Sequence, residues 1–201
     1  MGAAFDVMTA ENFHAALKSA TDSKHRALEQ LSISRNLADG SITLDDYLSY
    51  LRAMHDFVGS VERWALPVVA DLLPDAPRRI KAGWLASDLG RGPDGFTDLF
   101  PNAEWSQGFA LGVFYVLEGS TLGGRYILSR LSQTGMIPKE KTRFFEGYGN
   151  ASGAMWKQFL NVLSAYATNQ QIHEEIIRGA NFAFDTIKKH LAKVHENQGH
   201  R

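Results

Sequence analysis

The chain has 201 residues, 44% of them hydrophobic, and its 21 basic side chains nearly balance 22 acidic ones. A chain of this length forms one globular domain that buries about 70% of its unfolded surface. The balanced charge gives no sign of a nucleic-acid-binding surface. The lack of cysteine excludes disulfides, thiolate metal ligands and a cysteine nucleophile. Any metal ligand must therefore come from His, Asp, Glu, Tyr or Met.

The first twenty residues contain Asp6, Glu11 and Lys18 and lack an uninterrupted apolar core, so they do not resemble a secretory signal. No segment approaches the roughly 20 apolar residues of a membrane span. We therefore expect a soluble, cytoplasmic protein without a membrane or nucleic-acid partner. Residues 1–201 are expected to form a single domain, with 1–9 and 196–201 as flexible tails.

Apolar residues recur three and four positions apart along most of the chain, which predicts helices. The first helix is expected from Ala10 to about Leu31, followed by a loop that contains Gly40. Thr43 is placed to cap the next helix, which we expect to reach a bend at Pro67.

A short helix is expected from Arg78 to Leu89, before the turn-rich segment GRGPDG. A long helix is expected to have Asn102 as its cap and to end at Gly135. Two further amphipathic helices cover Ala154 to about Ala167 and Gln170 to about Val194. No segment alternates with period two, so the expected fold is all-α, a single domain of six to eight helices.

The long helix, around Gly108 to Arg130, is rich in glycine. Each interior glycine costs a helix about 1 kcal/mol relative to alanine. Gly119 and Gly123 are four residues apart, so they lie one above the other on one helix face and present nearly bare backbone, against which a flat molecule could lie. Two alternatives stay open here: glycines also let a second helix approach closely, or mark a bend.

His25 and Glu29 are also four residues apart and face the same way on the first helix. A neutral imidazole can bind a metal through Nε2 while a carboxylate orients Nδ1–H, directly or through water. The alternative is an ordinary solvated or partly buried histidine. Haem suits both patterns, because it is flat, takes an axial histidine and accommodates a helix on its other face.

Other catalytic motifs are absent: the chain has no Walker loop, no strand-led GxGxxG, no HExxH and no GxSxG. A carboxylate-bridged di-iron bundle needs E-x-x-H pairs on two helices. Only one such pair is present, Glu11 with His14, which argues against a di-iron centre.

Four segments together resemble the soluble bacterial haem oxygenases, in the same order and at similar separations: SATDSKHRALEQL, YVLEGSTLGGRYI, MWKQFL and GANFAF. The similarity covers about residues 10 to 192. The glycine run with a histidine about 95 residues upstream is a specific signal. The resemblance implies a multi-helical bundle in which haem lies between a proximal helix and a glycine-rich distal helix.

The resemblance also implies roles for single residues. His25 matches the proximal iron ligand, and Glu29 stands where the carboxylate that orients this ligand is found. Gly119, Gly123 and Gly124 match the distal glycines, which let the backbone approach the oxygen bound to haem and bend it toward the rim of the ring.

Further positions match residues that hold or line the haem in the family. Lys18, Tyr115 and Lys157 match positions that hold the propionates, and Phe184 matches an aromatic residue of the pocket. For both lysines an ordinary solvated side chain is the alternative. Ser120 departs from many relatives, which have an aspartate directly after the first distal glycine. A hydroxyl can organise a water relay but is a poorer proton reservoir than a carboxylic acid.

The function implied by the resemblance is that of a haem-degrading monooxygenase, with haem b as both substrate and cofactor. The family converts haem, O2 and external electrons into biliverdin, carbon monoxide and ferrous iron. The chain has no flavin or nicotinamide motif, so a separate electron donor of the ferredoxin or flavodoxin type is expected. A haem carrier or sensor that does not turn over shares His25 and the flat helix, and is the alternative. Thiamin-related hydrolysis on a similar bundle is a third candidate, against which the lack of cysteine argues.

Overall fold

The computed structural model describes residues 10–101 and 103–196. In this range the chain forms eight α-helices and four short 3-10 helices and contains no strand. Their bounds are α1 Ala10–Glu29, α2 Ser32–Asp39, α3 Leu44–Val69, η1 Ala70–Leu72, η2 Ala76–Arg79, α4 Ala82–Leu89, α5 Gln107–Thr134, η3 Lys139–Lys141, α6 Arg143–Glu146, η4 Gly149–Ala151, α7 Ser152–Tyr166 and α8 Gln170–Glu196. The predicted all-α single domain is confirmed. Apart from Glu196, the expected tails lie outside the described residues.

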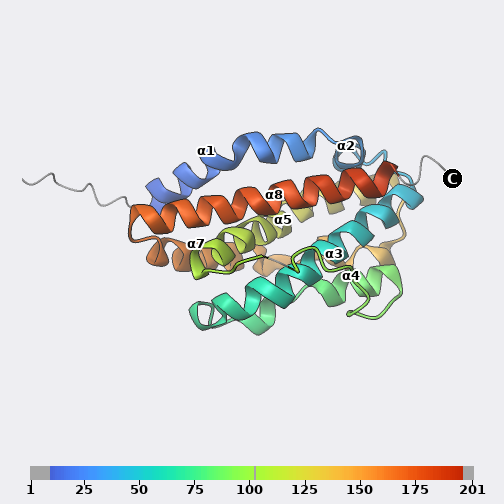
Figure 1. Ribbon diagram of the computed structural model, residues 1–201. Helices are drawn as coiled ribbons and strands as arrows, with labels where there is room; N and C mark the ends of the chain where they lie inside the picture. The colour runs from blue at the N-terminus through green and yellow to red at the C-terminus, as the bar shows by residue number, and fades with distance from the viewer. Residues whose placement is uncertain (1–9, 102, 197–201) are drawn as a thin grey trace, which may run out of the picture.

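Helix α8 lies along the middle of the bundle, with α1 on one side of it and α5 on another (Figure 1). One hydrophobic core joins the helices. Leu17 of α1, Val58 of α3, Phe114 of α5, Phe159 of α7 and Ile176 of α8 are all fully buried in it. Burial of each such side chain stabilises the fold by about 1.5–3 kcal/mol. In the described part of the chain, none of the helices has the length and apolar character needed to cross a bilayer.

Two glycines explain how closely α5 and α8 pack. A Cβ atom at Gly112 of α5 would overlap the carbonyl oxygen of Ile176, and one at Gly179 of α8 would overlap the carbonyl oxygen of Phe109. Only glycine lets two backbones approach this closely. Close helix packing, one of the alternatives left open by the sequence, is therefore the role of Gly112.

The expected loop between the first two long helices is wrong in part, because residues Ser32–Asp39 form helix α2. This helix buries Ile33 and Leu37, which are four residues apart, and it ends at Gly40 with a left-handed φ of 81°. Two apolar positions are too few to give a recognisable period. Packing against the core, rather than local pattern, stabilises this helix.

The long glycine-rich helix begins later than predicted. Asn102 lies outside the described residues, and the cap is Ser106, whose side chain accepts a hydrogen bond from the backbone N–H of Phe109 at 3.2 Å. The predicted end is confirmed, since Gly135 closes α5 with a φ of 65°. The predicted cap of α3 is confirmed as well, because Thr43 accepts a hydrogen bond from the Asp46 N–H at 3.2 Å.

Two other boundaries differ from the prediction. The helix expected from Arg78 to Leu89 is divided into η2 and α4, with Ile80 and Lys81 between them. Helix α3 continues past Pro67 to Val69. A proline lacks the N–H for one helical hydrogen bond and its ring crowds the carbonyl four residues earlier, which favours a helix end soon after it. A bend at Pro67 stays a prediction.

Candidate functional site

The middle of α5 has an open face that carries two of the predicted glycines. Among the described residues, none lies within 4 Å of a Cβ atom placed at Gly123, and only the ring of Trp156, at 3.8 Å, approaches one placed at Gly119. On the same part of the helix, Leu122 is 41% and Tyr126 is 57% exposed. The bare face predicted from the four-residue spacing is thus present. Exposed apolar side chains beside it are typical of a binding surface.

The third predicted distal glycine, Gly124, faces another way. It is buried, and a Cβ atom there would lie 3.2 Å from the backbone carbonyl oxygen of Phe145 in α6. Its missing side chain therefore permits α6 to pack against α5. A role of Gly124 next to bound oxygen stays a prediction.

His25 lies on α1 with 54% of its side chain exposed. Its Nδ1 atom is 3.6 Å from Oε1 of Glu29. This distance is longer than a direct hydrogen bond, and a water molecule can bridge such a separation. Within the part of the chain that the structure describes, no hydrogen bond engages Nε2 of His25. That nitrogen is therefore free to bind a ligand.

Helix α8 brings a second predicted residue to His25. The ring of Phe184 packs edge-on against the imidazole, with the ring centroids 5.5 Å apart and an interplanar angle of 75°. Phe184 is buried in the core, so it forms a fixed apolar wall beside the more exposed histidine.

The residues predicted to hold propionates lie in different environments. Lys18 and Lys157 are exposed. Tyr115 is buried, with its ring centroid 5.5 Å from that of Trp156. Burial raises the pKa of Tyr115, so its hydroxyl stays protonated at neutral pH. A role of these three residues toward propionates stays a prediction.

Ser120 is exposed on the open side of α5, and its hydroxyl donates a hydrogen bond of 2.7 Å to the backbone carbonyl of Leu117. This local bond uses the one hydrogen of the hydroxyl. The oxygen can still accept a hydrogen bond from a water molecule.

Two residues beside the open face were not among the predicted site residues. Trp156 covers the Gly119 side of the face, and His14 of α1 packs edge-on against both Trp156 and Tyr115, with centroid distances of 6.0 Å. Burial, and then the positive charge of Lys18, lower the pKa of His14, so its imidazole is neutral at neutral pH. Its position three helical turns before His25, on the same face of α1, is the sequence signal that indicates it.

The N-terminal part of the chain approaches α5 at both ends of the open face. At one end His14 contacts Tyr115. At the other end a Cβ atom at Gly40, just after α2, would lie 3.3 Å from the carbonyl oxygen of Arg130. Between these contacts no atom of His25 comes within 4 Å of a Cβ atom at Gly119 or Gly123. The predicted iron ligand, His25, therefore does not contact the open face at Gly119 and Gly123.

A buried ionic cluster holds α5 directly before the open face. Glu118 is almost fully buried and accepts hydrogen bonds from Arg79 at 2.6 Å, from Lys81 at 2.6 Å and from the Tyr148 hydroxyl at 3.0 Å. Burial, and then the charge of Glu118, raise the pKa of Tyr148, so its hydroxyl stays a donor. The sequence analysis missed this cluster, because its members lie on separate elements.

Glu118→Gln is expected to destabilise the protein by about 3 kcal/mol, because Lys81 would stay buried without its paired carboxylate, whereas Arg79 keeps its ion pair with Asp75. Urea unfolding of the ligand-free protein measures the loss. Tyr148→Phe is the matched control: it removes one hydrogen bond and no charge, and should cost only about 1 kcal/mol. Similar small losses for both variants would contradict the electrostatic explanation.

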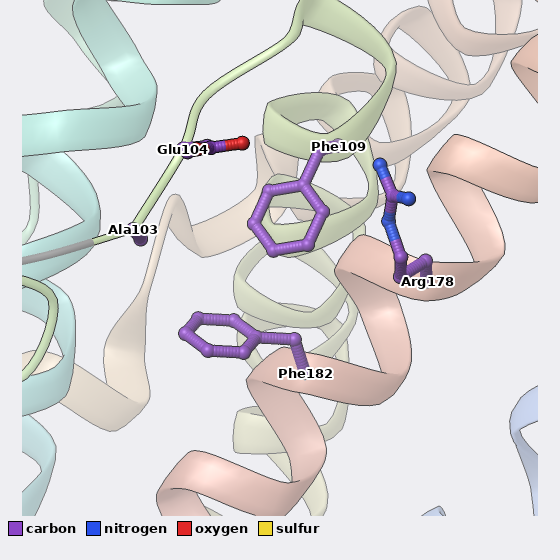
Figure 2. A pocket seen from close by; sticks show the side chains of 5 residues that line it. All are labelled: Ala103, Glu104, Phe109, Arg178 and Phe182. Atoms are coloured by element: carbon purple, nitrogen blue, oxygen red, sulfur yellow. The ribbon is translucent and has the colours of Figure 1, made fainter.

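A separate pocket of about 270 Å³ lies near the start of α5 (Figure 2). Its lining residues are Ala103, Glu104, Phe109, Arg178 and Phe182. Figure 2 shows the two phenylalanine rings projecting into it from α5 and α8. None of the predicted site residues lines this pocket, so it is distinct from the open face.

Comparison with known proteins identifies a family that part of the chain resembles. A family model described as Heme oxygenase matches residues 100–193, which include α5, α7 and most of α8. The sequence matches no curated protein.

Solved structures of three bacterial haem oxygenases share the fold. The enzyme from Neisseria meningitidis, solved with NO and CO bound, is 21% identical, with a TM-score of 0.74 over 92% of this chain and 92% of that one. The Leptospira interrogans enzyme is 16% identical, with a TM-score of 0.75 over 90% and 98%. Haem oxygenase-1 from the cyanobacterium Synechocystis, solved in complex with haem, is 16% identical, with a TM-score of 0.71 over 92% and 93%. The predicted resemblance to the haem oxygenases is therefore confirmed: their family model matches residues 100–193, and solved haem oxygenases share the fold over at least 90% of the chain.

Proposed function

We propose that the protein is a haem-degrading monooxygenase that uses O2 and external electrons to convert haem into biliverdin, carbon monoxide and ferrous iron. One combination supports this proposal most strongly. An exposed imidazole, His25, has its Nε2 free and its Nδ1 near Glu29, while α5 keeps a bare face at Gly119 and Gly123.

The residues present fit a haem better than they fit a metal ion bound by protein ligands alone. Among the side chains that the structure describes, no group of three or more His, Asp or Glu could hold a metal ion. A haem iron needs only an axial ligand from the protein, because the ring supplies the other nitrogens. His25 can supply that ligand, and the buried ring of Phe184 beside it suits an apolar macrocycle.

When bound, haem supplies an iron centre that reacts with O2. The contribution of the chain is to bind and orient. His25 would hold the iron through Nε2, and the Glu29 carboxylate would attract the Nδ1 proton and so orient the imidazole. The bare backbone at Gly119 and Gly123 would leave space for O2 and water next to the bound haem. The Ser120 hydroxyl donates its hydrogen to Leu117, so its oxygen would accept a hydrogen bond from a water molecule there, and that water would be the proton donor.

The proposal includes the propionate contacts and the electron donor. Lys18 and Lys157 are exposed cations that can pair with carboxylates, and the Tyr115 hydroxyl is a protonated donor. Electrons come from a separate donor of the ferredoxin or flavodoxin type, in the cytoplasm. The resemblance to the family supports both the propionate contacts and the separate electron donor.

Reconstitution with haem tests the function. We expect a histidine-ligated ferric spectrum, followed by loss of the Soret band when a reductant and air are added. Chromatography should then identify a bilin, and added myoglobin should trap carbon monoxide. A Soret band that persists under these conditions would favour the haem carrier or sensor instead.

Glu29→Gln is expected to shift the iron–histidine stretching frequency and to slow turnover by up to about tenfold, because the amide keeps the shape of the side chain but loses the charge that orients Nδ1. Resonance Raman spectroscopy of the ferrous protein measures the shift. Asp22→Asn is the matched control, since Asp22 lies on the same helix but pairs with Arg26. Identical spectra for Glu29→Gln and the wild type would count against the orienting role.

A further inference from the structure

Two neighbouring residues of α8 contact two neighbouring residues of α1. The ammonium group of Lys24 donates hydrogen bonds to both carboxylate oxygens of Asp185, at 2.8 and 2.7 Å. Directly beside this ion pair, the Phe184 ring packs edge-on against His25. The residue predicted to bind iron is therefore flanked by a contact that joins its helix to α8.

The Lys24–Asp185 ion pair differs from the other ion pairs of α1, because it joins α1 to another helix. In the first half of the helix, the side chains of Phe13 and Leu17 are buried in the core. In the second half, the other ion pairs, Asp22 with Arg26 and His25 with Glu29, lie within α1 itself. By contrast, the two hydrogen bonds from Lys24 to Asp185 join α1 to another helix, α8.

Helix α8 also holds the opposite side of the candidate site. Gly112 and Gly179 bring the backbones of α5 and α8 into direct contact, which fixes α5 against α8. The position of the open face and the position of His25 are thus both set relative to α8. The backbone contact sets the first, and the Lys24–Asp185 pair with Phe184 sets the second.

We propose that Lys24 and Asp185 are positioning residues for His25: their ion pair fixes the rotation of α1 against α8, and with it the direction in which the imidazole Nε2 points. This inference rests on the proposed function, because it takes His25 as the iron ligand. The two side chains are 41% and 40% exposed. Ion pairs with this exposure contribute about 1 kcal/mol or less to stability, so loss of the pair can change the orientation of His25 while it leaves the melting temperature nearly unchanged.

The ligand-free protein provides the first test. Because Phe184 lies edge-on to His25, its ring current shifts the NMR signals of the imidazole protons. In Lys24→Gln and Asp185→Asn these signals should move toward those of a free histidine, at one fixed pH. The melting temperatures should stay close to that of the wild type.

Arg26→Gln is the matched control. It removes one positive charge from the other neighbour of His25 and breaks an ion pair of 2.8 Å, but that pair lies within α1 and does not involve α8. Its imidazole signals should therefore keep the shift caused by Phe184. The double exchange Lys24→Asp with Asp185→Lys re-forms the pair with reversed charges and should restore the signals.

The haem-bound protein provides the second test. Transfer of haem to apomyoglobin should be roughly tenfold faster for Lys24→Gln and Asp185→Asn than for the wild type. Their iron–histidine stretching frequencies should shift as well. Arg26→Gln and the double exchange should resemble the wild type in both measurements.

Unchanged imidazole signals in Lys24→Gln and Asp185→Asn would overturn the inference, whatever happens to haem. Equal changes in Arg26→Gln would also overturn it, because the effect would then be one of charge alone. A wild-type protein that binds haem without degrading it would refute only the proposed function. The signals of the ligand-free variants would still decide whether the pair positions His25.

Discussion

His25→Ala is expected to abolish nearly all haem turnover and to remove the histidine-ligated ferric spectrum, while the protein still folds. The side chain is half exposed, and its contacts are an edge-on ring and an ion-pair distance of 3.6 Å to Glu29. Truncation of such a surface residue changes stability by about 0.5 kcal/mol or less. The loss of function therefore has to come from the missing ligand and not from unfolding.

Two controls sharpen this experiment. Added imidazole should fill the space left by the truncated side chain and restore the spectrum. His14→Ala removes the histidine three turns earlier on the same face of α1 and should keep the histidine-ligated spectrum. A spectrum lost in His14→Ala but retained in His25→Ala would show that the iron ligand was assigned to the wrong residue.

Gly123→Ala is expected to stabilise the ligand-free protein by up to about 1 kcal/mol and to reduce biliverdin formation sharply. The stability gain follows because alanine favours the helix and no part of the described chain lies within 4 Å of the added methyl group. Under the proposed function, the methyl group would occupy the space that O2 and water need in the haem-bound protein. Binding through His25 should persist. The measurements are the urea midpoint of the ligand-free protein and the single-turnover yield of biliverdin.

Gly112→Ala, the same change on the same helix, is the control, for which we expect the opposite effect on stability. Its methyl group would overlap the Ile176 carbonyl, so the expected effect is a destabilisation of about 1–3 kcal/mol. If Gly123→Ala instead lowered stability and left turnover intact, Gly123 would be a packing residue too. The proposed role of the open face would then be wrong.

The long helices could be predicted because each carries its own apolar period. The first helix, the end of α5 at Gly135, and helices α7 and α8 lie close to where the sequence places them. Helix α2 and the start of α5 at Ser106 were not predicted, since a short helix has little periodicity and several polar residues before α5 could serve as its cap. In both cases tertiary contacts decide between local conformations of similar energy.

Part of the candidate site follows from spacing within one helix. His25 and Glu29, and likewise Gly119 and Gly123, are four residues apart, and helix geometry alone places each pair on one face. The other contacts join distant parts of the chain. Lys24 and Asp185 are 161 residues apart, and Lys81 and Glu118 are 37 apart. The periodicity of residues within one helix does not predict such pairs, so only the folded structure identifies them.

The sequence by itself determined that this protein is all-helical, that His25 has a carboxylate one turn away, and that α5 carries bare backbone, because these properties depend on the periods of single helices. The tertiary structure alone decided what each glycine does. Gly112 and Gly123 are chemically identical and lie on the same helix, yet one meets the backbone of α8 and the other meets open space. The difference lies in their neighbours, and the neighbours are set by how α8 packs against the rest of the bundle.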